Sequence, residues 1–226
     1  MKRENIKVDV FNWGPCVIKL KVSDWLVKTL LKEGKNNRID FTDKLAGIIE
    51  NETGYSDKSK KIVLPELSQY LGVYDQVYQN YVKQPYEKKP EYILTSMWIN
   101  HQRPHEYNPP HDHDGKLSFV IYLQIPEELK EEQKKYKGKS CGPGGIQFLY
   151  GDNSPRDAIT FMSVFPEVGD MFIFPSWLKH WVAPYKSDCL RVSVSGNFHD
   201  NVPLNNVVDF APSYIQSKKL NNSEKK

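Results

Sequence analysis

Seven short segments with the composition of β-strands follow one another between residues 92 and 198. Glycine, proline and aspartate separate these segments, and such residues favour turns between strands. Short strands at this spacing predict two packed antiparallel sheets, as in a sandwich or a jelly roll. The predicted strands are Tyr92–Asn100, Leu117–Ile125, Gly145–Tyr150, Ala158–Phe165, Asp170–Phe174, His180–Pro184 and Leu190–Phe198.

The first 90 residues differ, because most of their apolar residues recur at helical spacing. Residues 6–20 alternate loosely and predict two short strands or an extended entry segment. The predicted helices are Ser23–Gly34, Thr42–Gly54 and Pro65–Val82. In the last of them an apolar and tyrosine-rich stripe favours packing on a sheet. The fold class is therefore mainly β with N-terminal helices, an α+β chain.

The length of 226 residues is sufficient for one domain with a substantial core. We expect a single domain over residues 1–226. Within it, residues 1–90 provide an N-terminal strand and supporting helices, residues 91–200 form the β core, and residues 201–226 form a polar C-terminal tail. The charged segment Glu127–Lys139 is either a short helix or a solvated loop.

Charge and composition exclude several classes of protein. The 31 basic and 28 acidic residues give a net charge of +3, which argues against binding of duplex nucleic acid. The three cysteines lack CxxC spacing, so the sequence suggests neither a thiolate zinc site nor a redox pair. No apolar run approaches the ~18 residues of a membrane span. We expect a cytoplasmic protein that does not bind a membrane.

Four of the six histidines lie between Trp98 and Pro126, just before the clearest predicted strand. In the sequence His111-Asp112-His113, an extended backbone would direct both imidazoles to the same side and Asp112 to the other. Two imidazoles in this arrangement can share one metal ion. A third ligand is available at His180, in a strand distant along the chain. Two neighbouring ligands plus a distant third are typical of a catalytic mononuclear metal site.

The strand that begins near Leu190 carries a second polar cluster. Alternation places Arg191, Ser193 and Ser195 on one face and apolar residues on the other. A guanidinium binds a carboxylate through two hydrogen bonds, and a serine hydroxyl adds a further one. The pattern predicts a carboxylate-binding site.

The motifs of the β region follow the order H-x-H, S-F-V-I-Y-L, G-G-x-x-F, G-D-x-x-I-F-P-S-x-x-x-H and R-x-S. The segments FNWGPCV and WIN precede them. This set of motifs resembles the iron(II)- and 2-oxoglutarate-dependent oxygenases, in particular a prolyl-hydroxylase-like group of bacterial or phage proteins. The fold that this resemblance implies for residues 91–200 is a cupin-like double-stranded β-helix, or jelly roll.

The resemblance also implies roles for individual residues. His111 and His180 match the two histidine ligands of the metal, and His113 stands where these enzymes usually carry an aspartate. We expect His113 to be the third ligand, although Asp114 could serve if the chain turns there. The residues matching the 2-oxoglutarate site are Arg191, Ser193 and Tyr122, with Asn100 as a weaker candidate for contact with the cosubstrate or the product. No catalytic residue beyond the metal centre is implied.

The implied function is that of a dioxygenase that uses Fe(II), 2-oxoglutarate and O2. It would hydroxylate a peptide side chain or a small molecule and release succinate and CO2. One alternative is a cupin-like metalloprotein with three histidines that does not use 2-oxoglutarate, since this ligand set also suits zinc. Another is a jelly-roll binding protein without enzymatic activity. The sequence leaves the primary substrate, the native metal and the oligomeric state open.

Overall fold

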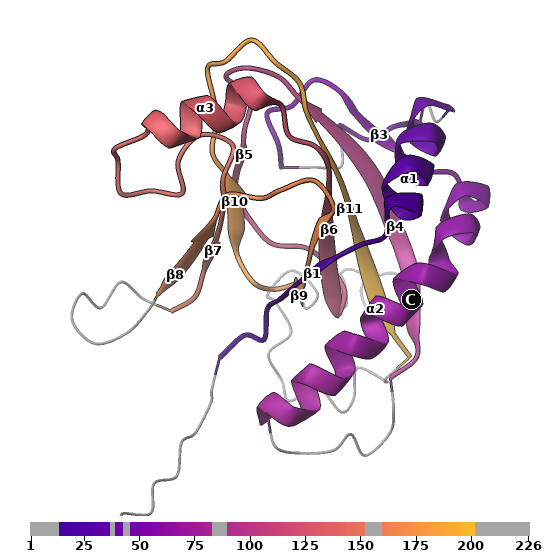
Figure 1. Cartoon of the computed structure of the whole chain (residues 1–226). Coiled ribbons are helices and arrows are strands. Elements are labelled where there is room, and N and C mark those ends of the chain that lie inside the picture. Colours follow the sequence, from indigo (N-terminus) through magenta and orange to yellow (C-terminus); the bar gives the residue numbers. More distant parts are fainter. Residues whose placement is uncertain (1–13, 37–38, 43–45, 83–89, 152–159, 202–226) are drawn as a thin grey trace, which may run out of the picture.

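The computed structural model describes residues 14–36, 39–42, 46–82, 90–151 and 160–201. In this part of the chain two antiparallel sheets face each other, and the predicted mainly β class is confirmed (Figure 1). The order of strands in the larger sheet is β1 (Ile18–Lys21), β9 (Asp170–Pro175), β6 (Leu117–Gln124), β11 (Arg191–Asp200), β4 (Tyr92–Gln102), β3 (Glu52–Gly54) and β2 (Ile39–Asp40). The order in the smaller sheet is β5 (Asn108–His111), β10 (His180–Val182), β7 (Ile146–Leu149) and β8 (Phe161–Val164).

Helices α1 (Asp24–Asn36) and α2 (Asp57–Val82) cover the outer face of the larger sheet, opposite β7, β8 and β10 (Figure 1). Strand β6 is buried on both faces, and its side chains alternate between two apolar clusters. Phe119 and Ile121 pack with the helices, whereas Val120 and Tyr122 belong to the cluster between the sheets. This alternation directs Tyr122 into the space between the sheets.

The stripe on α2 packs as predicted, but the helix begins eight residues before the expected start. Leu67, Leu71 and Tyr74 are buried in the outer cluster. The helix begins after Ser56, whose Oγ accepts a hydrogen bond from the backbone N–H of Ser59 at 3.2 Å. Pro65 therefore lies inside the helix, and the sequence prediction wrongly took it for the start, a position that proline favours.

The predicted helix Thr42–Gly54 is wrong in the residues that the structure describes. Gly54 ends strand β3, and the backbone N–H of Ile48 donates to the carbonyl of Tyr107 at 2.9 Å. Ile48, an apolar residue within that predicted helix, is 59% exposed. Gly47 interrupts the segment and weakens a helix there by about 1 kcal/mol, so that pairing with β4 prevails over a weak helical pattern.

The apolar cluster between the sheets fixes their separation. Phe172 and Phe174 of β9 meet Phe148 of β7, with ring centroids 5.8 and 5.0 Å apart, respectively. Aromatic side chains of this size fill the space between stacked sheets, which lie roughly 10 Å apart. The sheets thereby hold the side chains at the open end of this interior at fixed positions.

The remaining predicted strands agree with the structure to within a few residues. Strand β5 is new, because no strand was predicted in its proline-rich segment. Glu127–Lys135 forms helix α3, which is one of the two alternatives predicted for that charged segment. The expected tail after residue 201 and most of the entry segment lie outside the described residues. None of the helices in the described ranges is both long and apolar enough to cross a membrane.

Candidate functional site

Three histidines meet where β5 and β10 pair. His111 ends β5 and His180 begins β10, and the two residues are directly opposite each other across the strands. His113 lies two residues beyond β5, where its backbone N–H donates to the carbonyl of Ser176 at 2.9 Å. One nitrogen from each imidazole lies within 4.8 Å of the others, a spacing that suits one metal ion. The structure therefore brings together all three predicted ligands.

Hydrogen bonds to the backbone orient two of these rings. The Nδ1 atoms of His111 and His180 lie 2.6 Å and 2.9 Å from the carbonyl oxygens of Pro109 and Leu178, respectively. A ring that donates through Nδ1 presents Nε2 to a metal, as second-shell contacts do in metalloenzymes. His113 has a different support, because the edge of its ring meets Trp98 with centroids 5.6 Å apart.

Burial keeps the three imidazoles in the neutral form that binds metals. It is the main cause that lowers the pKa of each, and it brings the pKa of His113 to about 3 with a further contribution from His111. The pKa of His180 lies well below its usual value for the same reason. Asp112 and Asp114 are exposed, and neither belongs to this cluster of ligand atoms.

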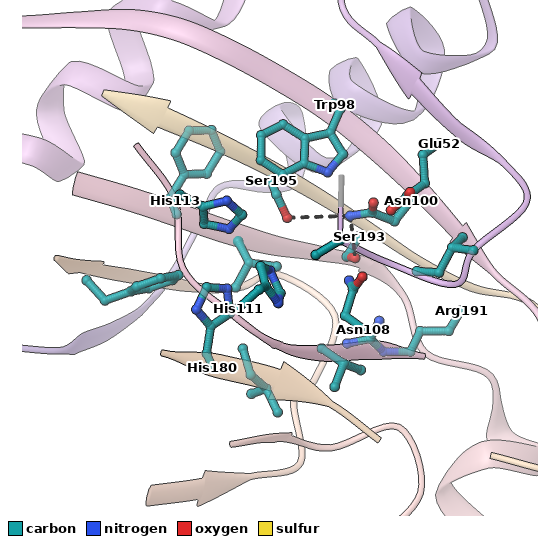
Figure 2. A pocket seen from close by; sticks show the side chains of 17 residues that line it. Glu52, Trp98, Asn100, Asn108, His111, His113, His180, Arg191, Ser193 and Ser195 are labelled. Atoms are coloured by element: carbon teal, nitrogen blue, oxygen red, sulfur yellow. Dashed lines mark hydrogen bonds between the residues drawn. The ribbon is translucent and has the colours of Figure 1, made fainter. Parts of the chain in front are cut away.

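The histidines form one wall of a pocket whose other wall is the larger sheet. Figure 2 shows the three imidazoles on one side and Asn100, Ser193, Glu52 and Arg191 on the other. The polar wall follows one row across four strands, because the register pairs Glu52 with Asn100, Asn100 with Ser193, and Ser193 with Tyr122. We call Glu52, Asn100, Ser193 and Tyr122 the polar row.

Arg191 reaches into the pocket from β11 and is only 2% exposed. Its Nη1 donates to Oε1 of Gln102 at 2.9 Å, and its guanidinium carbon lies 4.9 Å from the centre of the Tyr122 ring. Within the described residues, its Nε and Nη2 and the Tyr122 hydroxyl have no hydrogen-bond partner. Burial raises the pKa of Tyr122 to about 12, so this hydroxyl remains a donor. These unpaired donors form a receptor for an anion.

Asn100 and Ser193 also lie at the predicted site, beside each other in the polar row. The amide nitrogen of Asn100 donates to the hydroxyls of Ser193 at 3.5 Å and Ser195 at 3.4 Å. The predicted alternation of Arg191, Ser193 and Ser195 into one pocket is confirmed. All predicted site residues therefore converge on one place, with Tyr122 just behind Arg191.

The sequence prediction missed two buried polar residues of the site, Gln102 and Glu52. Gln102 follows Asn100 by two residues and faces the same way, so strand alternation could have identified it. It holds Arg191 and donates through Nε2 to the carbonyl of Glu106 at 2.7 Å. Glu52 lies in the segment wrongly predicted to be helical, and no motif marks it.

Comparison with protein families identifies the β region. Residues 96–197 match the family model described as "Putative 2OG-Fe(II) oxygenase". This region belongs to the 2-oxoglutarate- and Fe(II)-dependent oxygenase superfamily. The match lies inside the predicted β core, residues 91–200, and confirms the resemblance based on the sequence motifs. A comparison with curated protein sequences found no match.

Several solved structures of oxygenases are similar to this chain at low sequence identity. A Burkholderia pseudomallei oxidoreductase of the 2OG-Fe(II) oxygenase family is 10% identical, with a TM-score of 0.52, and the alignment covers 81% of this chain and 84% of that one. The carbocyclase SnoK from nogalamycin biosynthesis is 12% identical with a TM-score of 0.51 and 87% coverage of both chains. A Pseudomonas putida prolyl-4-hydroxylase is 17% identical, with a TM-score of 0.47 and coverage of 81% and 92%.

The residues present fit the cofactors of this superfamily. Three neutral imidazoles converge on one point, and buried, unpaired donors of Arg191 and Tyr122 lie across the pocket from them. The first set suits a divalent transition metal, and the second suits a carboxylate. The family match over residues 96–197 and these two sets of residues support an oxygenase that uses Fe(II) as its metal and 2-oxoglutarate as its cosubstrate.

Proposed function

We propose that this protein is a hydroxylase that acts on a peptide side chain or a small molecule. In this proposal His111, His113 and His180 hold Fe(II), while Arg191, Tyr122 and Ser193 bind the distal carboxylate of 2-oxoglutarate. The bound metal and cosubstrate supply the oxidising chemistry, consuming O2 and releasing succinate and CO2. The chain itself binds, orients and shields the reactants.

The buried guanidinium of Arg191 is the observation that carries this proposal. Its unpaired Nε and Nη2 lie at the end of a pocket whose other wall carries the metal-binding histidines. A buried cation without a counter-ion is strongly unfavourable, so the site favours occupation by an anion. A dicarboxylate that reaches the metal with one end and Arg191 with the other matches this arrangement.

Other residues of the chain restrict how the cosubstrate is held. Gln102 accepts a hydrogen bond from Nη1 of Arg191 and thereby leaves Nε and Nη2 for the carboxylate. Phe174 packs against His180 with centroids 4.8 Å apart, and the surrounding apolar side chains exclude water from the metal side. Exclusion of water strengthens the electrostatic contacts in the pocket.

The proposal extends to the architecture. The two facing sheets of residues 91–200 correspond to the double-stranded β-helix, or jelly roll, that the sequence motifs imply. Strands and helices before residue 91 support this core, so that residues 1–226 form one domain with a C-terminal tail. The packing of α1 and α2 on the larger sheet supports this division of roles.

Binding of 2-oxoglutarate tests the proposal directly. Isothermal titration calorimetry of the anaerobic, Fe(II)-loaded protein should show 2-oxoglutarate binding that Arg191→Met weakens by ~100-fold, because a buried charged hydrogen-bonding partner contributes about 2–5 kcal/mol. Arg103→Met is the matched control, since this arginine is 60% exposed and should be replaceable without effect. Unchanged affinity in Arg191→Met would refute the cosubstrate site.

The purely histidine ligand set favours one competing function, a metalloprotein that does not use 2-oxoglutarate. Metal analysis combined with the same titration separates the two. Both functions require His180→Ala to empty the metal site. A wild-type protein that retains metal but neither binds 2-oxoglutarate nor releases succinate would support the competitor.

A further inference from the structure

Glu52 is a buried carboxylate that binding of the cosubstrate leaves unexplained. It lines the same pocket as the histidines and Arg191 and is 1% exposed. Neither of its oxygens has a hydrogen-bond partner within the described residues. Burial is the main cause that raises the pKa of Glu52 to about 7, and the like charge of Glu106 adds to it.

The position of Glu52 excludes a role in holding 2-oxoglutarate. The polar row places Glu52 at one end and Tyr122, beneath Arg191, at the other. Three strand spacings separate these ends, which corresponds to about 14 Å. A carboxylate also repels a dianionic cosubstrate. Glu52 therefore faces a part of the pocket that remains for the second reactant.

The surroundings of Glu52 restrict what this reactant can present. A side-chain methyl placed on Gly47 would lie 3.3 Å from Oε1 of Glu52 and 2.2 Å from Oδ1 of Asn108, so both side chains converge beside the backbone of Gly47. Ile49 and Trp98 add apolar surface to the lining. The subsite thus combines apolar walls with acceptor oxygens at one end.

A positively charged nitrogen group satisfies this environment best. A hydrogen bond from the amide of Asn100, the neighbour in the polar row, would leave the negative charge of Glu52 uncompensated. The carboxylate of Glu106 adds to the negative potential and is held in place by the backbone N–H groups of Glu50 at 3.1 Å and Arg103 at 2.7 Å. Buried charges are stable when they are paired with an opposite charge.

We propose that Glu52 forms the anionic end of a primary-substrate subsite that takes an amine or guanidine carried on an apolar stem. This inference rests on the proposed function, because the subsite belongs to the second reactant of the same pocket. It narrows the substrate class to cationic molecules or basic side chains. Glu52 acts here as a specificity-determining residue.

Simple cationic probes test the subsite without knowledge of the natural substrate. Pentylammonium, butylguanidinium and 1-pentanol are titrated calorimetrically into the anaerobic protein loaded with Fe(II) and 2-oxoglutarate. The two cations should bind ~10-fold or more tightly than the alcohol, a difference of about 1.4 kcal/mol in binding free energy. Glu52→Gln should abolish this preference. Glu50→Gln, which changes a carboxylate that is 83% exposed, should retain it.

Equal affinity of the wild-type protein for cations and alcohol would overturn the inference, whatever the stability of the variants. A preference that survives in Glu52→Gln would do the same. Binding of 2-oxoglutarate is measured in the same samples, and it separates a failure of the Glu52 subsite from a failure of the proposed function. If it is intact and depends on Arg191 while no cation preference appears, only the subsite assignment fails. If 2-oxoglutarate does not bind, the proposed function itself fails.

Discussion

His113 stands where the oxygenases that this chain resembles usually carry an aspartate, and its surroundings support the proposal that it is a metal ligand. Its backbone N–H is held by Ser176, and its ring lies against Trp98. A third imidazole in place of a carboxylate leaves a divalent ion with a formal charge of +2 instead of +1. The greater charge strengthens the attraction for a dianionic cosubstrate.

Substitution in the His111-Asp112-His113 sequence tests which side chain completes the metal site. His113→Ala should reduce the affinity for Fe(II) by ~100-fold or more, since one of three ligands is lost. Asp112→Asn should leave the affinity unchanged, because Asp112 is exposed and lies outside the cluster. Anaerobic competition with a chromophoric chelator measures both affinities. Loss of metal in Asp112→Asn with retention in His113→Ala would reverse the assignment.

Among the secondary-structure elements, the sequence predicted the strands after residue 91 better than the helices of the first 90 residues. The strand that carries Arg191 could be predicted, because a long alternating strand with a polar inner face has a strong pattern. The segment around Gly47 and Ile48 could not, because its isolated backbone hydrogen bond to Tyr107 depends on distant residues. Strand β5 was missed for the same reason, since its two prolines obscure a pairing fixed by β10.

The start of α2 offers a test at this scale. Ser56→Ala removes the Oγ that accepts the N–H of Ser59, and loss of such a cap costs about 1 kcal/mol of unfolding free energy. Ser68→Ala is the control within the same helix. Its Oγ donates to the carbonyl of Leu64 in the preceding turn, so this change should be neutral or slightly stabilising. Urea denaturation compares the free energies of unfolding of the two variants. Equal losses would contradict a capping role for Ser56.

For the whole molecule, the pKa of Glu52 couples stability to pH. Its folded-state pKa of about 7 lies above the ordinary value of 4.5, so between these values the folded protein holds more protons than the unfolded chain. The free energy of unfolding therefore falls as pH rises through this window. The total loss is about 3 kcal/mol above pH 7.

Glu52→Gln should remove this loss. Urea denaturation of the metal-free proteins at pH 5 and pH 8 should show the variant gaining stability relative to wild type as pH rises. The histidines titrate alike in both proteins, so their contribution cancels in the comparison. Stability curves that stay parallel from pH 5 to pH 8 would show that Glu52 is not buried as described.

The polar row shows why the sequence reveals only part of the site. His111, His113 and Arg191 belong to motifs with recognisable spacing. Glu52 joins them only because β3 pairs with β4 and β4 pairs with β11. Such an adjacency is a property of sheet order, which no local pattern contains.

The two halves of the pocket are mounted on different sheets, with the imidazoles at β5 and β10 and the guanidinium on β11. The apolar cluster that includes Phe148, Phe172 and Phe174 lies between these sheets and holds them at their separation. Catalytic activity thus depends on how tightly the two sheets pack, because this packing sets the distance between the metal ligands and Arg191. A substitution that leaves a small cavity in this cluster would lower activity, even though the strands and the polar residues of the pocket stay unchanged.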